Sequence, residues 1–172
     1  MKLVKKLMES IREYKKASIL TPIFVTVEVV MEVLIPFVMA SLIDKGIEAG
    51  SMSVIWKYGI LLLVLAMISL AFGTLAGHQA SIASCGLSQN LRKDMYYRIQ
   101  NFSFSNIDKF STASIVTRLT TDVTNVQNAY QMIIRIAFRA PIMLVFALVM
   151  SFTINVKISL IFLATVPVLG FV

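Results

Sequence analysis

Two glutamates in a long apolar stretch are the side chains of this chain most suited to chemistry. Glu28 and Glu32 are the two charged residues within residues 17–43. Their i, i+4 spacing places both carboxylates on one face of a helix. Inside a membrane each ionised group costs about 2.5–3.5 kcal/mol, so it needs water or a polar partner. Two interpretations of the glutamates stand. In the first, they line a water-filled path and attract cationic, amphipathic substrates. In the second, they have a packing role, in which they either bond to neighbouring helices or are protonated in a packed interface.

Other motifs that carry chemistry are missing from the sequence. None of the seven glycines is followed by Lys-Ser or Lys-Thr, as a phosphate-binding P-loop requires. One histidine, His78, and one cysteine, Cys85, leave no metal-ligand cluster and no catalytic triad. We therefore expect no catalytic, cofactor-binding or metal-binding residue in this chain.

The composition is that of a membrane protein. Hydrophobic residues make up 58% of the chain, charged residues 15%, and the mean hydropathy is +0.82. Soluble domains contain roughly 45–50% apolar residues, so a soluble or disordered chain is excluded. The net charge is +7, but the basic residues flank apolar runs. This placement favours the phosphates of a lipid bilayer as the partner, and no nucleic acid.

Four apolar stretches are the candidate membrane-spanning helices, and the first of them carries Glu28 and Glu32. A membrane-spanning helix needs about 20 apolar residues. Residues 17–43, 58–82 and 136–156 satisfy this requirement, whereas residues 158–172 are too few to cross a bilayer. We therefore expect three complete spans, a truncated fourth, and a chain that is the N-terminal part of a longer membrane domain.

The distribution of basic residues predicts the orientation. They gather in the N-terminal tail and in the stretch from the end of the second span to the start of the third, at Lys2, Lys5, Lys6, Arg12, Lys15, Lys16, Arg92, Lys93, Arg98, Lys109, Arg118, Arg135 and Arg139. Cytoplasmic segments are enriched in Lys and Arg, so we expect a multi-pass protein with a cytoplasmic N-terminus. Apolar residues at helical spacing in residues 1–16 predict an amphipathic helix along the inner membrane surface.

Residues 83–135 form a connection far longer than the roughly 4–6 residues that are typical. Apolar residues at three- and four-residue spacing predict two helical arms, which extend two spans into the cytoplasm as a hairpin. Ser111, Thr112 and Ser114 are candidate caps for the second arm. The tip consists of Ser105, Asn106, Ile107, Asp108, Lys109 and Phe110. Within the tip, Ile107 and Phe110 form an exposed apolar pair. This pair needs a partner, either another protein or a neighbouring loop of the same molecule.

Three segments carry a family resemblance: residues 36–47 with a proline followed by Ile43-Asp44, residues 91–123 around the hairpin, and residues 135–141. They resemble the transmembrane domains of ATP-binding cassette (ABC) exporters of the multidrug and lipid-flippase type. The fold implied is an all-α membrane protein, a polytopic helical bundle with two spans extended into the cytoplasm. Within residues 17–172, the tip 105–110 would be the coupling helix.

The resemblance also implies partners. The coupling helix would dock on a nucleotide-binding domain, encoded in a missing C-terminal part or another chain, which would bind ATP and Mg²⁺. A second half-transporter would complete a homo- or heterodimer, most simply in a bacterial plasma membrane. The alternative is a self-contained multispan protein, either a proton-coupled efflux carrier that uses Glu28 or Glu32, or a membrane scaffold that presents the hairpin.

Overall fold

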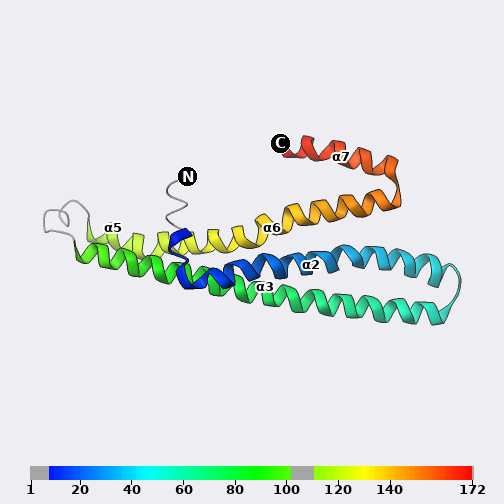
Figure 1. The fold of residues 1–172 in the computed structure, drawn as a ribbon, viewed down its shortest axis with the longest axis horizontal. Coiled ribbons are helices and arrows are strands. Elements are labelled where there is room, and N and C mark those ends of the chain that lie inside the picture. Colours follow the sequence, from blue (N-terminus) through cyan, green and yellow to red (C-terminus); the bar gives the residue numbers. More distant parts are fainter. Residues whose placement is uncertain (1–7, 102–110, 172) are drawn as a thin grey trace. The chain divides into compact units, whose positions relative to one another are not determined.

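A computed structural model describes residues 8–101 and 111–171 of the chain (Figure 1). Within these residues the chain is helical and contains no strand, which confirms the all-α fold class. The helices are α2 (Lys15–Leu42), α3 (Met52–Gln100), α5 (Thr112–Thr117), α6 (Val123–Ile154) and α7 (Val156–Phe171). Short elements adjoin them: a 3₁₀ turn at Arg12–Tyr14 and π-helical turns at Ile43–Ile47 and Arg118–Asp122.

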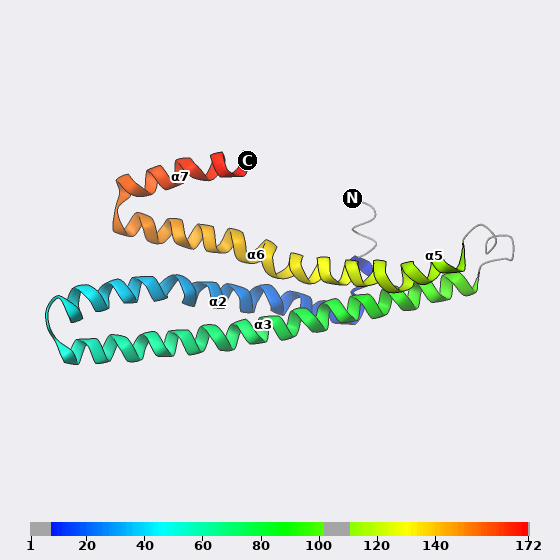
Figure 2. The ribbon, with the colours of Figure 1, turned by 180° about the vertical axis from the view of Figure 1, so that it is seen from behind.

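Among the described residues, three helical segments are long and apolar enough to cross a membrane. They are Arg12–Ile47, Met52–Gln100 and Ala113–Ile154, with mean hydropathies of 2.2, 2.4 and 2.1 in their most apolar windows. α3 is one helix of 49 residues, visible from both sides in Figures 1 and 2. Since about 20 residues cross a bilayer, α3 is more than twice as long as a membrane span requires.

The contacts divide the chain into two units. Unit 1 contains Met1–Ile23 and Leu75–Ala137, and unit 2 contains Phe24–Thr74 and Phe138–Val172. α2, α3 and α6 each contribute residues to both units.

Small residues on α3 allow close packing in unit 1. The core combines Ala17 of α2, Ala80 and Ala83 of α3 and Ile134 of α6, with Tyr130 packed against it. Apart from Leu87, the further buried positions on α3 in this unit are also small or polar: Ala76, Ser84, Gly86, Ser88 and Asn90. Small side chains let helix backbones approach, which is the usual way membrane helices gain van der Waals contact.

The residues before α2 are held on α3 by specific polar contacts. Arg12 forms an ion pair with Asp94 at 2.9 Å, and the Asn90 side chain donates to the carbonyl of Ser10 at 2.9 Å. The Tyr14 ring lies so close to Gly86 that a Cβ there would overlap atoms of the ring. Gly86 is therefore a packing requirement for Tyr14.

The surface helix expected over residues 1–16 falls partly outside the described residues, which begin at residue 8. The described part is not one regular helix, because Ser10 and Ile11 form a turn and Arg12 has a left-handed φ of +42°. Such a backbone conformation costs roughly 1–2 kcal/mol, which the Arg12–Asp94 and Asn90–Ser10 contacts offset. Contacts with α3 thus determine the backbone conformation of this segment. The helical spacing of its apolar residues did not reveal this conformation.

Adding a methyl group at Gly86 is expected to destabilise unit 1. In Gly86→Ala the new Cβ overlaps the Tyr14 ring, and overpacking of this kind costs about 1–3 kcal/mol. Gly59→Ala is the matched control, because Gly59 lies on the same helix with no atom within 4 Å of the added Cβ. Thermal unfolding in detergent should give a lower Tm for Gly86→Ala than for Gly59→Ala; equal Tm values would contradict the packing assignment.

In unit 2, α2 and the first part of α3 run antiparallel and side by side, as both views show (Figures 1 and 2). The turn between them uses Gly50 at a φ of +63°, a conformation that favours glycine. Phe24 of α2 and Phe72 of α3 pack with ring centroids 5.9 Å apart. At the junction of α6 and α7, the hydroxyls of Ser151 and Ser159 lie 2.7 Å apart.

Candidate functional site: an arginine between two carboxylates

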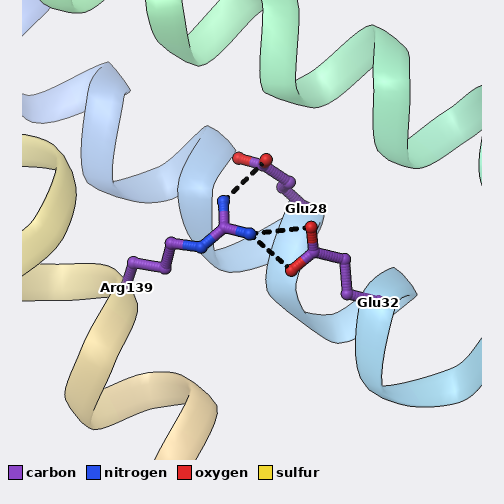
Figure 3. A network of polar contacts seen from close by, with 3 residues as sticks. All are labelled: Glu28, Glu32 and Arg139. Atoms are coloured by element: carbon purple, nitrogen blue, oxygen red, sulfur yellow. Dashed lines mark hydrogen bonds and ion pairs between the residues drawn. The ribbon is translucent and has the colours of Figure 1, made fainter.

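The two glutamates singled out by the sequence share one arginine in unit 2 (Figure 3). Nη1 of Arg139 donates to Oε1 of Glu28 at 2.8 Å. Nη2 of Arg139 donates to both carboxylate oxygens of Glu32, each at 2.8 Å. We call Glu28, Glu32 and Arg139 the charged triad.

The helices place the triad by simple geometry. Glu28 and Glu32 lie one turn apart on α2, so their carboxylates lie on the same face of that helix. Arg139 comes from α6, and Figure 3 shows its guanidinium between the two carboxylates. The planar guanidinium has donors on two nitrogens, so it can bond both carboxylates at once, which a lysine cannot match.

Burial differs across the triad. The side chains of Glu28, Glu32 and Arg139 are 10%, 31% and 35% exposed. Glu28 is thus the buried end of the triad, whereas Glu32 and Arg139 form its open end. A ligand that approaches the triad meets Glu32 and Arg139 first.

A glycine on α3 makes room for Glu28. A Cβ added at Gly73 would lie 3.0 Å from Oε1 of Glu28, a contact tighter than side chains normally tolerate. The second oxygen of this carboxylate, Oε2, is buried and has no hydrogen-bond partner among the described residues. An unsatisfied buried polar group costs about 1–3 kcal/mol, so the triad is not a fully compensated structural ion pair.

The charges in the triad do not cancel. Two carboxylates and one guanidinium carry a net formal charge of minus one. The other charged residues of unit 2 lie near the ends of its helices, at Asp44, Lys45, Glu48, Lys57 and Lys157. The triad itself therefore carries a net negative charge on otherwise apolar segments, and Arg135, one helical turn before Arg139 on α6, is the next cation along that helix.

Arg139 is the member of the triad that the sequence analysis did not connect to the site. In the sequence, Arg139 is one of the basic residues that indicate the orientation and belongs to the resemblance over residues 135–141, and neither observation links it to the glutamates. The available signal was charge balance: the third span, 136–156, contains one cation, and the first contains two anions. Because an unpaired charge on an apolar helix is costly, an ion pair between the cation of the third span and the anions of the first could have been predicted.

The remaining candidate residues lie elsewhere or outside the described part. The tip residues Ser105, Asn106, Ile107, Asp108, Lys109 and Phe110 fall within residues 102–110, outside the described residues. In unit 1, Cys85 is exposed and its Sγ accepts a hydrogen bond from Gln127 at 3.4 Å. Across residues 8–101 and 111–171, no group of three His, Cys, Asp or Glu side chains is placed to hold a metal ion.

Comparison with known proteins adds a family match. Residues 18–172 match the family described as the ABC transporter transmembrane region. The chain is 34% identical over 166 residues to the ABC transporter ATP-binding protein YfiB of Bacillus subtilis, covering 96% of this chain and 29% of that protein. An ATP-dependent lipid A-core flippase of Pseudoalteromonas translucida is 25% identical over 167 residues, covering 96% of this chain and 29% of the flippase. The chain thus spans less than a third of the length of these relatives.

Proposed function

The chain belongs to the family of ABC transporter transmembrane regions, and from this premise we propose that it forms part of the substrate path of an ATP-driven exporter. Its three apolar helices and its family establish a membrane protein of the transporter type. The charged triad is the observation that carries the proposal of a substrate path, because it holds a net negative charge with an open end at Glu32 and Arg139. Cationic, amphipathic compounds are the substrates that such a site attracts.

The energy source in this proposal is a nucleotide-binding domain, which binds ATP and Mg²⁺. YfiB is named an ATP-binding protein, and the match covers only 29% of its length. A cassette would therefore be encoded after this segment or on another chain. The tip 105–110 would dock on that cassette as the coupling helix, and a second half-transporter would complete the path. The N-terminus would then lie on the cytoplasmic side of a bacterial plasma membrane.

The proposal is tested by transport in inverted membrane vesicles that contain the complete transporter. We expect Glu28→Gln and Glu32→Gln to lower the transport of a cationic compound about tenfold, which corresponds to about 1.4 kcal/mol of lost attraction. Transport of a neutral analogue should change much less, because the amide has no charge to lose. Asp44→Asn is the matched control, since Asp44 is an exposed carboxylate at the end of the same apolar segment.

Two outcomes would favour a packing role for the carboxylates instead. One is an equal loss of transport for the cationic and the neutral compound. The other is loss of the protein from the membrane, which would show that the ion pairs serve assembly. The amount of inserted protein is therefore measured for each variant alongside transport.

A further inference from the structure

The charge balance of the triad points to a more specific property than attraction of cations. Arg139 bonds both carboxylates but carries one positive charge, so the three side chains of the triad together carry a formal charge of minus one. A ligand with one positive charge would make the site neutral. A neutral ligand leaves the site with a net charge of minus one, and a ligand with two positive charges gives it a net charge of plus one. In an apolar environment, either residual charge is costly.

We infer that Arg139 sets the charge of the substrate: it is a tethered counter-ion that makes the site select compounds with a single positive charge. This inference rests on the proposed function and adds a role for a residue of α6. Arg139 is a positioning and specificity residue here, because it tunes the net charge of the two carboxylates that attract the substrate.

The contacts indicate at which carboxylate a cationic ligand would compete with Arg139. Glu32 is the more exposed carboxylate, and one nitrogen of Arg139 serves both of its oxygens. The other nitrogen of Arg139 bonds Glu28, whose side chain is 10% exposed. A cation can therefore compete for Glu32 at the open end while Arg139 stays bonded to Glu28. Oε2 of Glu28 has no hydrogen-bond partner among the described residues.

The test uses a matched series of compounds on one aromatic scaffold, with zero, one or two quaternary ammonium groups. Their charge is independent of pH, so differences report on the site. Stimulation of ATP hydrolysis and transport are measured for the complete transporter. The wild type should prefer the monocation to both the neutral compound and the dication by about tenfold in half-saturating concentration.

Two variants test the charge count, because the first changes the net charge of the triad and the second restores it. Glu28→Gln makes the triad neutral, leaves the Arg139–Glu32 pair in place and should abolish the preference for the monocation. Glu28→Gln/Arg139→Gln restores a net charge of minus one on Glu32, the partly exposed carboxylate, and should restore that preference. Arg139→Lys keeps the charge, so it should keep the order of preference among the three compounds even where overall transport is lower, which provides a second measurement if the double variant is poorly folded.

The outcomes separate this inference from the proposed function. If the transporter moves these compounds with the same order of preference in the wild type, Glu28→Gln and the double variant, the charge count of the triad does not select substrates. If none of the three compounds is transported or stimulates ATP hydrolysis in the wild type, the proposed substrate path itself is wrong. A preference for the monocation that follows the net charge of the triad supports both this inference and the proposed function.

Discussion

An Arg139→Gln variant of the complete transporter is expected to yield much less folded protein than the wild type. The change leaves two carboxylates without their shared cation, and one of them, Glu28, is 10% exposed. Removing one partner of a buried ion pair costs about 3–5 kcal/mol. Because Arg139 itself is 35% exposed, we expect the lower end of this range. The measurement is the Tm of the detergent-purified transporter and the yield of monodisperse protein.

Two further variants distinguish loss of charge pairing from loss of the arginine side chain itself. Glu28→Gln/Arg139→Gln removes the buried carboxylate as well and should recover most of the lost stability, because Glu32 is 31% exposed and can be hydrated. Arg139→Lys retains the charge but not the two-sided hydrogen bonding, so it should cost less than Arg139→Gln. A single variant Arg139→Gln with the wild-type Tm would show that the ion pairs contribute nothing to stability.

Replacing Phe110 by alanine is expected to uncouple ATP hydrolysis from transport. In the proposed assembly Phe110 fills a pocket on the cassette, with Ile107 beside it and Asp108 and Lys109 at the polar rim. Buried aromatic anchors contribute up to about 2–4 kcal/mol at interfaces, so transport should fall by roughly 30-fold or more. Nucleotide binding to the cassette should stay nearly unchanged. Lys109→Ala, a change at the rim, is the control and should have a small effect.

Crosslinking tests the same contact independently of activity. Cys85 is the chain's single cysteine, so Cys85→Ser provides a background without reactive thiols in this segment. Asp108→Cys should then form a disulfide with a cysteine on the cassette surface. Wild-type transport by Phe110→Ala, together with no crosslink in any nucleotide state, would rule out the tip as the coupling element and leave the hairpin as a structural extension.

The helices themselves were largely accessible from the sequence. The apolar stretch 17–43 corresponds to α2, Lys15–Leu42, and the periodicity after the second span corresponds to α3, which continues to Gln100. Ser111, predicted as a cap, does accept a hydrogen bond from the backbone N–H of Ser114 at the start of α5. Hydropathy, periodicity and capping involve residues within one or two helical turns, so the sequence displays them directly.

The π-helical turn Arg118–Asp122 and the left-handed Arg12 were not predictable in this way. No residue type in these segments requires such a backbone. Arg12 adopts its conformation beside Asp94, which lies 82 positions further along the chain. In the described part of this segment, residues 8–16, the contacts of Ser10 and Arg12 with α3 compete with the local preference for a regular helix. Tertiary packing therefore overrides propensity at this point.

The sequence by itself determined that this protein is a helical membrane protein with two carboxylates on one face of its first span. Only the tertiary structure decided that Arg139 lies between them, 111 positions from Glu28 and 107 from Glu32. Helical periodicity places residues around a single axis, but a contact between two helices also depends on their relative rotation and offset. These are set by packing over many residues, such as Gly73 against Glu28, and a one-residue shift of α6 turns Arg139 away by about 100°.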